Sequence, residues 1–250
     1  MSTPPHPFPH SAPTLQGDTV GSLIASGTEL LQAAGISFGH GTTNAFDEAA
    51  WLVLWRLGLP LDAPLGDDID SVQNQAVTPA GRALVATLFE ERISTRKPAA
   101  YLTPEAWPQG VPFYVDERAI VPRSCIAELL ADPDQTGHLD YWLGEHTQRV
   151  LDLCTGNGSL AVLAAMAWPE VVVTGADISP DALAVARINV DKHGLQDRIQ
   201  LQISDGLAAL PGPWDLILCN PPYVNAASMA ALPAEYRAEP ELALSGNMHG

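Results

Sequence analysis

The sequence predicts an α/β protein, in which a mostly parallel, doubly wound sheet follows a small helical domain. From residue 150 onward, short apolar runs alternate with segments of helical periodicity. A glycine-rich turn separates the first of these runs from the first helical segment. Residues 18–95, in contrast, carry their apolar side chains mainly at three- and four-residue steps, which is typical of packed helices.

The first half of the chain predicts three segments. Residues 1–17 contain five prolines and little apolar patterning, so we expect a disordered tail. Residues 18–97 form the helical domain, where Thr78 and Pro79 are an N-cap and first-turn proline that open a helix. Residues 98–123 are punctuated by prolines, and their strand-like alternation over "FYVDERAIV" predicts a linker hairpin.

Residues 124–250 predict the sheet-containing domain. A short helix near 124–131 comes first, and the remaining elements are the strands "RVLDLC", "VVVTGAD", "RIQLQIS" and "WDLILCN" and the helices "SLAVLAAMAW" and "SPDALAVARINVDKHG". Ser179 and Pro180 open the second of these helices, and Gly194 ends it. A sheet of this kind binds ligands at the carboxyl ends of its strands, so the loops after the strands should carry the chemistry.

The composition of the chain limits the classes of partner that it can bind. Acidic residues outnumber basic ones 29 to 12, and a net charge of -17 repels a phosphate backbone. We therefore expect a basic protein partner and no direct contact with nucleic acid. The three cysteines have no metal-like spacing, which predicts neither a metal nor a disulfide. No apolar run approaches the roughly 20 residues of a membrane span, and the first basic residue is Arg56, so we expect a cytoplasmic protein.

The loops after the first two strands predict an adenosine ligand. In "DLCTGNGSLA", Gly156 and Gly158 let the backbone approach a ligand closely, and the following helix offers amide donors. Asp177 ends the second strand, where a carboxylate accepts both hydroxyls of a ribose. Because Gly156, Gly158 and Ala161 also satisfy the relaxed dinucleotide fingerprint, NAD remains an alternative at this point.

The loops after the last two strands distinguish the ligands. Asp205 in "SDG" is placed to bond an adenine amino group. After the fourth strand, the Asn220 side chain and the Pro221 carbonyl offer two acceptors on one rigid corner, which fit a planar NH2 group, and Tyr223 packs on its plane. NAD chemistry has no use for such a corner. S-adenosylmethionine has the same adenosine and a methyl group that must meet a nucleophile, so it is the favoured ligand.

The quoted motifs carry a family resemblance. "NPPY" and "DLCTGNG" are similar to those of the amino-methyltransferases, and longer segments narrow the resemblance to the HemK/PrmC-like protein N5-glutamine methyltransferases. These segments are "GHGTTNAFDEAAWLV" (39–53), "PAAYLTPEAW" (98–107), "FYVDERAIVPRS" (113–124), "ADISPDALAVARIN" (176–189) and "LPAEYRAEPEL" (232–242). The resemblance implies a SAM-dependent methyltransferase with a Rossmann-like sheet.

The resemblance also implies the reaction and its residues. The substrate would be a glutamine side chain of a basic ribosomal protein, large-subunit protein L3, and the second product S-adenosylhomocysteine. The corner that grips the glutamine amide would consist of Asn220, Pro221, Pro222 and Tyr223. The cofactor-binding candidates are Asp152, Thr155, Gly156, Gly158, Asp177, Ile178, Asp205, Gly206, Asn220 and Arg123.

Alternatives remain open at this stage. Arg123 belongs to a segment similar to the one that closes over the cofactor in the family, but a surface ion pair is an alternative. Release-factor glutamine methylation, adenine N6-methylation of DNA and a non-catalytic binder of ribosomal protein are the competing functions, and the negative charge disfavours DNA. The chain has fewer readable strands than a complete sheet of this family, so we expect it to be incomplete at the C-terminus, prone to self-association and a poor methyltransferase alone.

Overall fold

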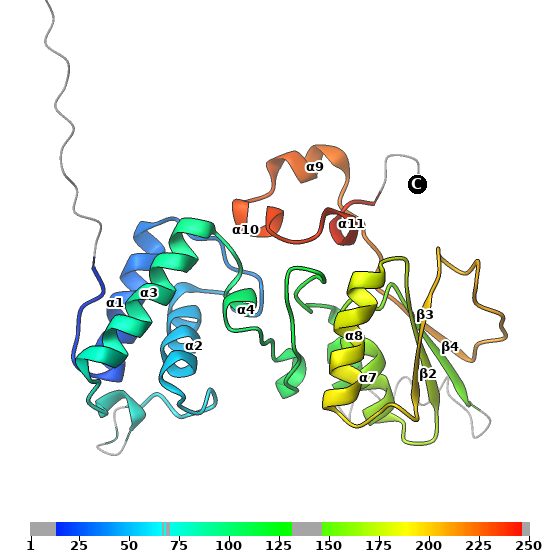
Figure 1. Ribbon diagram of the computed structural model, residues 1–250, viewed down its shortest axis with the longest axis horizontal. Coiled ribbons are helices and arrows are strands. Elements are labelled where there is room, and N and C mark those ends of the chain that lie inside the picture. The colour runs from blue at the N-terminus through cyan, green and yellow to red at the C-terminus, as the bar shows by residue number, and fades with distance from the viewer. Residues whose placement is uncertain (1–13, 67, 69–70, 132–146, 247–250) are drawn as a thin grey trace, which may run out of the picture. The chain divides into compact units, whose positions relative to one another are not determined.

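The computed structural model describes residues 14–66, 68, 71–131 and 147–246. It divides into two compact units, Met1–Arg96 and Lys97–Gly250 (Figure 1). Most of the tail predicted over residues 1–17 lies outside the described residues. Its last part is not a disordered tail, because Leu15 is buried and the Gln16 backbone N–H donates to the Ser26 hydroxyl at 2.9 Å.

The first unit is helical. Its described elements are α1 (Val20–Ala33), α2 (Ala45–Leu57), the short 3-10 helix η1 (Val72–Asn74) and α3 (Pro79–Thr95). Each α-helix begins at a side-chain cap, provided by Thr19, Asn44 and Thr78, which satisfies a backbone N–H of the first turn. The predicted opening of a helix at Thr78 and Pro79 is therefore confirmed.

An internal ion pair joins two helices of the first unit. Arg92 of α3 donates from Nε to Oε1 of Glu48 of α2 at 2.8 Å, and both side chains are almost completely buried. The Thr42 hydroxyl donates to the other oxygen of Glu48 at 3.1 Å. Charges in such a place need partners, since an unpaired buried charge is strongly destabilising. The pair therefore fixes how α3 lies on α2.

The second unit begins with short elements and an irregular segment. These elements are α4 (Ala99–Leu102), the 3-10 helix η2 (Pro108–Gly110) and α5 (Cys125–Ala131). The helix expected near 124–131 is confirmed by α5.

The strand expected over residues 113–121 is absent. One isolated antiparallel bridge, between Ala106 and Phe113, takes the place of the predicted linker hairpin. The alternation of apolar residues comes from burial alone, because the backbone N–H groups of Tyr114 and Val121 donate to side chains of other segments. Side chains thus supply the acceptors that a neighbouring strand would otherwise provide.

The sheet of the second unit is parallel throughout. Its strands are β1 (Arg149–Leu153), β2 (Val172–Asp177), β3 (Ile199–Ile203) and β4 (Leu216–Cys219), in the order β3-β2-β1-β4. Helix α7 (Ser159–Ala167) connects β1 to β2, and α8 (Pro180–Lys192) connects β2 to β3. All four predicted strands and both connecting helices are present, and Ser179 caps α8 as expected.

The strand order creates a switch point. From β1 the chain moves outward to β2 and β3, and then returns to place β4 on the other side of β1. Loops that leave β1 and β4 therefore diverge at the carboxyl end of the sheet, which is where open α/β sheets bind ligands.

The two faces of the sheet are covered differently. Helices α7 and α8 lie along one face (Figure 1), where their apolar residues form the main core with those of the strands. On the other face, the connection from β3 to β4 packs Leu210 and Trp214 against Leu151 and Ala176. Leu218 of β4 packs into the core on the α7 and α8 side, whereas Ile217 points to the other face and remains 45% exposed. In the described part of the sheet, β4 is also an edge strand.

The chain after β4 forms three short helices, α9 (Ala226–Ala231), α10 (Ala234–Arg237) and α11 (Glu241–Leu244). This segment returns to its own beginning, since Val224 and Ser245 form a parallel bridge. Among the described residues, no helix is long and apolar enough to cross a bilayer.

Candidate active site

A cavity of about 450 Å³ lies at the carboxyl end of the sheet, within the second unit. Four groups of residues line it: the loops after the strands, the irregular segment before α5, the corner after β4 and the helices that follow that corner. The predicted site residues among them are Arg123, Thr155, Gly156, Asp177, Ile178, Asp205, Gly206, Asn220, Pro221, Pro222 and Tyr223. The fold therefore brings together residues that are up to a hundred positions apart in the chain.

The loop after β1 turns through residues of positive φ. Gly156 has a φ of +55° and Gly158 a φ of +80°, values that favour glycine. Gly158 serves helix packing, because a Cβ there would lie 3.0 Å from the Cβ of Ala186 on α8. Gly156 faces the cavity, where a Cβ would come 3.7 Å from Ile120. The two glycines thus have different roles. Gly158 was predicted to contact the cofactor, but it does not line the cavity.

Asp152 lies beneath this loop and does not line the cavity, which corrects its expected contact with the cofactor. Its carboxylate is fully buried and accepts hydrogen bonds from the Thr155 hydroxyl and from the Ala161 backbone N–H, the latter at 3.0 Å. Burial raises the pKa of Asp152 to about 7, although both hydrogen bonds act to lower it. Asp152 therefore shapes the loop and the start of α7.

Asp177 joins the ends of two neighbouring strands. Its Oδ2 accepts the Gly156 backbone N–H and its Oδ1 accepts the Ser179 backbone N–H, both at 2.9 Å. Each carboxylate oxygen retains a second lone pair. The side chain lines the cavity beside Ile178, which is 48% exposed. The orientation of this carboxylate is thus fixed by the backbone.

The Asn220–Tyr223 corner follows the edge strand β4 directly. Asn220 and Pro222 are half-buried, whereas Tyr223 is 79% exposed. All four residues line the cavity. The two prolines limit the backbone conformations of the corner and so restrict the direction of its carbonyl acceptors.

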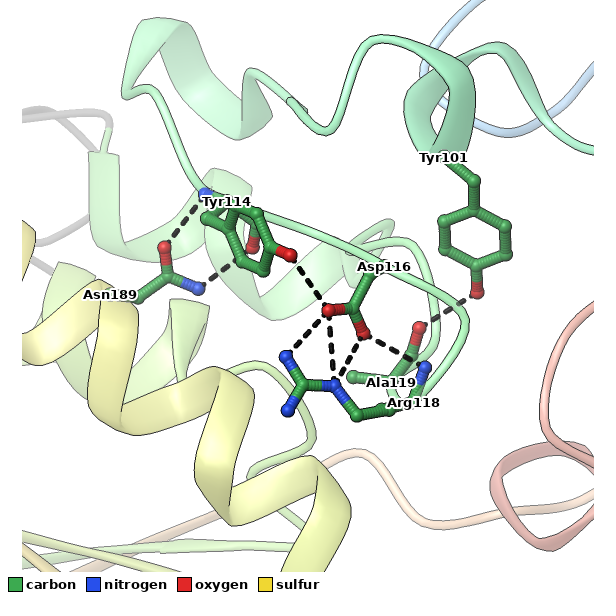
Figure 2. Close-up of polar contacts among 6 residues, drawn as sticks. All are labelled: Tyr101, Tyr114, Asp116, Arg118, Ala119 and Asn189. Atoms are coloured by element: carbon green, nitrogen blue, oxygen red, sulfur yellow. Dashed lines mark hydrogen bonds and ion pairs between the residues drawn. The ribbon is translucent and has the colours of Figure 1, made fainter.

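We call the segment Tyr114–Ser124 the cover segment; its residues 118–124 line the cavity. Hydrogen bonds with Asn189 and with Tyr101 hold it in place (Figure 2). The Asn189 side chain of α8 accepts the Tyr114 N–H at 2.7 Å and donates to the carbonyls of Tyr114 and Asn157 at 2.9 and 2.8 Å. Because Asn157 belongs to the glycine loop, Asn189 ties that loop to the cover segment.

Two tyrosines and an ion pair complete the support of the cover segment (Figure 2). Asp116 receives hydrogen bonds from the Tyr114 hydroxyl at 2.8 Å and from the Arg118 guanidinium at 2.6 Å. The Tyr101 hydroxyl donates to the Ala119 carbonyl at 2.7 Å, and burial raises the pKa of Tyr101 far above its usual value. Arg118 and Ala119 also line the cavity, so these contacts support its wall.

Arg123 is neither an exposed surface residue nor unpaired. Its guanidinium donates to both carboxylate oxygens of Glu239, at 2.7 and 2.6 Å, and it lies 5.4 Å from the ring centre of Tyr236. Burial opposes the charge of Arg123, but the hydrogen bond and charge of Glu239 raise its pKa overall.

Sequence reasoning missed three kinds of residue. Asn189 carries a detectable signal, since it is an asparagine on the apolar face of α8. Glu239 carries none, because its partners are 116 and 118 positions away. Cys154 and Cys219 flank the site, and burial raises the pKa of both thiols, that of Cys154 to about 12. Neutral thiols are poor nucleophiles, so covalent catalysis by cysteine is disfavoured.

The sequence of the chain is similar to those of known methyltransferases. The sequence pattern of the family described as "Methyltransferase small domain" matches residues 137–236. The ribosomal protein uL3 glutamine methyltransferase of Burkholderia pseudomallei is 47% identical over 258 residues, covering 100% of this chain and 78% of its own. The proteins of the same name from Bordetella pertussis and Neisseria gonorrhoeae are 48% and 44% identical, each over 93% of this chain, and over 76% and 75% of their own lengths.

A solved structure gives a weaker likeness. The hMettl16 catalytic domain in complex with the MAT2A 3′UTR hairpin 6 aligns with 72% of this chain and 62% of its own, at 12% identity and a TM-score of 0.43. A likeness of this degree carries no argument about function.

Proposed function

Because the chain belongs to the family of ribosomal protein uL3 glutamine methyltransferases, we propose that it methylates the side-chain nitrogen of a glutamine in ribosomal protein uL3. The proposal rests mainly on one observation: the Asn220–Tyr223 corner, Gly156 and Asp177 all line the same cavity. A corner that accepts N–H groups and a loop that admits an adenosine are the two requirements of this reaction.

S-adenosylmethionine fits the residues that line the cavity. Asp177 would accept the ribose hydroxyls, Gly156 would allow close approach of the backbone, and Asp205 would accept the adenine amino group. The two arginines on the cavity wall, Arg118 and Arg123, are already paired with carboxylates, so the wall is poorly suited to a dinucleotide pyrophosphate. The cofactor supplies the methyl group, and S-adenosylhomocysteine is the second product.

The residues of the corner act on the substrate amide. The amide nitrogen is a weak nucleophile, because its lone pair is delocalised into the carbonyl. The Asn220 side-chain oxygen and the Pro221 carbonyl would accept its two N–H groups, which favours a pyramidal nitrogen and aims its lone pair at the methyl group. As the N–C bond forms and the S–C bond breaks, the same acceptors stabilise the positive charge on nitrogen. The nitrogen then loses one proton.

Orientation supplies most of the rate acceleration in this account. Holding two reactants in line contributes at best roughly 7 to 11 kcal/mol. No strong base is required before transfer, because the alkylated nitrogen becomes acidic and loses its proton late. Tyr223 would lie against the plane of the amide and limit the access of water.

The charge of the chain supports a basic partner. Ribosomal proteins are rich in lysine and arginine, and a protein with a net charge of -17 attracts them over a distance. We propose that the chain meets uL3 in the cytoplasm.

Incubation with isotope-labelled S-adenosylmethionine tests the proposal. Purified uL3 should take up the label on one glutamine, located by peptide mapping, and a uL3 variant with asparagine at that glutamine should take up none. A peptide-chain release factor, tested in parallel, should remain unlabelled. Label on the release factor in place of uL3 would assign the second substrate, and label on neither would reject the proposed reaction.

A further inference from the structure

Glu239 lies between the short helices α10 and α11, and its carboxylate accepts several hydrogen bonds from the cover segment. Its side chain is 0% exposed. The carboxylate accepts the Val121 backbone N–H at 3.0 Å and both terminal nitrogens of Arg123, at 2.7 and 2.6 Å. Bidentate, charge-assisted hydrogen bonds of this kind fix direction as well as distance. Glu239 therefore holds the end of the cover segment in one place.

The cover segment is in turn close to the loop that would hold the cofactor. Ile120 immediately precedes Val121 and is the nearest residue to the position of a Cβ on Gly156, at 3.7 Å. Residues Val121 and Arg123 themselves line the cavity. A shift of the Glu239 carboxylate would therefore change the wall that faces the glycine loop.

The chain that follows Glu239 supports the substrate corner. The Val224 N–H donates to the Leu244 carbonyl at 2.9 Å, and the Gly246 N–H donates to the Val224 carbonyl at 3.1 Å. Gly246 lies so close to the corner that a Cβ would be 2.8 Å from the Pro222 carbonyl oxygen. The stretch between Glu239 and Gly246 thus connects the cover segment to the back of the Asn220–Tyr223 corner.

We propose that Glu239 is a positioning residue for methyl transfer, which couples the cover segment beside the cofactor to the corner that holds the substrate amide. The identities of cofactor and substrate rest on the proposed function. Glu239 touches neither ligand and acts through Val121 and Arg123. Because methyl transfer requires both reactants in line, a displacement of about 1 Å between the two walls would lower the rate on the order of a hundredfold.

Two substitutions of the same chemistry test the coupling in the full chain. Glu239→Gln keeps an oxygen for the Val121 N–H but removes the charge that balances Arg123. Glu241→Gln is the matched control, because Glu241 is exposed and lies two residues further on. Glu239→Gln should weaken binding of S-adenosylmethionine about tenfold, within the usual range of coupling between sites, and lower kcat about a hundredfold. Glu241→Gln should match the unsubstituted chain in both quantities.

Hydrogen exchange separates coupling from a general loss of stability. In the unsubstituted chain, added S-adenosylmethionine should protect peptides from both 118–124 and 222–246. In Glu239→Gln it should protect the first region and leave the second unchanged. Glu239→Asp keeps the charge but cannot reach both partners at once, so it should give an intermediate kcat. It also provides a second variant if Glu239→Gln does not fold.

Two results would overturn the proposal. The first is a Glu239→Gln or Glu239→Asp variant that melts earlier but keeps the cofactor affinity, kcat and KM of the unsubstituted chain, since that describes a purely structural residue. The second is joint protection of both regions in Glu239→Gln. Failure of the proposed function has a different signature: a chain that binds S-adenosylmethionine, shows the coupled protection and leaves uL3 unlabelled.

Discussion

The Asp177 carboxylate accepts the Gly156 backbone N–H at 2.9 Å, which fastens the end of β2 to the glycine loop after β1. This single contact positions both the acid and the loop that we propose hold the adenosine. Asp177→Ala should weaken binding of S-adenosylmethionine by about 1.5 to 3 kcal/mol, the range for a hydrogen bond to a charged group. Titration calorimetry measures this change directly. Unchanged affinity, or tighter binding of NAD than of S-adenosylmethionine, would contradict the assignment.

Asn220 should matter for transfer more than for cofactor binding. Asn220→Ala removes an acceptor at the centre where charge develops, so we expect kcat to fall about a hundredfold or more. The affinity of the same variant for S-adenosylmethionine should stay close to that of the unsubstituted chain, and it serves as the internal control. If steady-state kinetics of Asn220→Ala showed near-normal turnover, the proposal that this corner holds the substrate amide would be wrong.

Asp152 predicts a particular dependence of stability on pH. Its pKa is raised from 3.8 to about 7 by burial, so between these values the unfolded chain is ionised while the folded chain keeps the proton. This contribution to stability is fully present below pH 3.8 and is lost as the pH rises to about 7.

The Asp152→Asn variant isolates that contribution, because it mimics the protonated acid at every pH. Urea denaturation of both proteins should show the unsubstituted chain losing stability relative to the variant as the pH rises from about 4 to about 7, with no further change above. A difference that is constant with pH would mean that Asp152 titrates normally.

Gly27 of α1 faces Phe89 of α3 at very close range. A Cβ on Gly27 would lie 2.4 Å from the Phe89 ring, and that ring is 1% exposed, so it has little room to move. Gly27→Ala should lower the free energy of unfolding of the first unit by about 1 to 3 kcal/mol through overpacking. Gly66→Ala is the matched control, because no atom lies within 4 Å of its added Cβ. Equal urea midpoints for the two variants would contradict the packing seen here.

The elements of the sheet domain could be predicted because their signals are local. Ser179 and Pro180 mark the start of α8. The four apolar runs are the strands, and each ends where a ligand-binding loop is expected to begin. The same logic placed Asn220 and Asp177 at one edge of the sheet, since parallel strands end together. The prediction succeeded where neighbouring residues alone decide the structure.

The cover segment shows what local patterns could not reveal. Its alternating residues predicted a strand, but the acceptors for its backbone come from Asn189 and Glu239, which are 75 and 118 positions away in the chain. Asp152 shows a second limit of local patterns. Its position near the carboxyl end of β1 suggested a ligand contact, but in the folded chain its carboxylate is buried and hydrogen-bonded beneath the loop.

Methyl transfer to uL3 is the measurement that tests the central claim most directly. The unsubstituted chain, labelled S-adenosylmethionine and purified uL3 should yield one labelled glutamine, with the label on the side-chain nitrogen, and the yield should fall about a hundredfold or more with Asn220→Ala. Label on another residue type, or equal labelling by Asn220→Ala, would contradict the claim that this corner presents a glutamine amide to the methyl group.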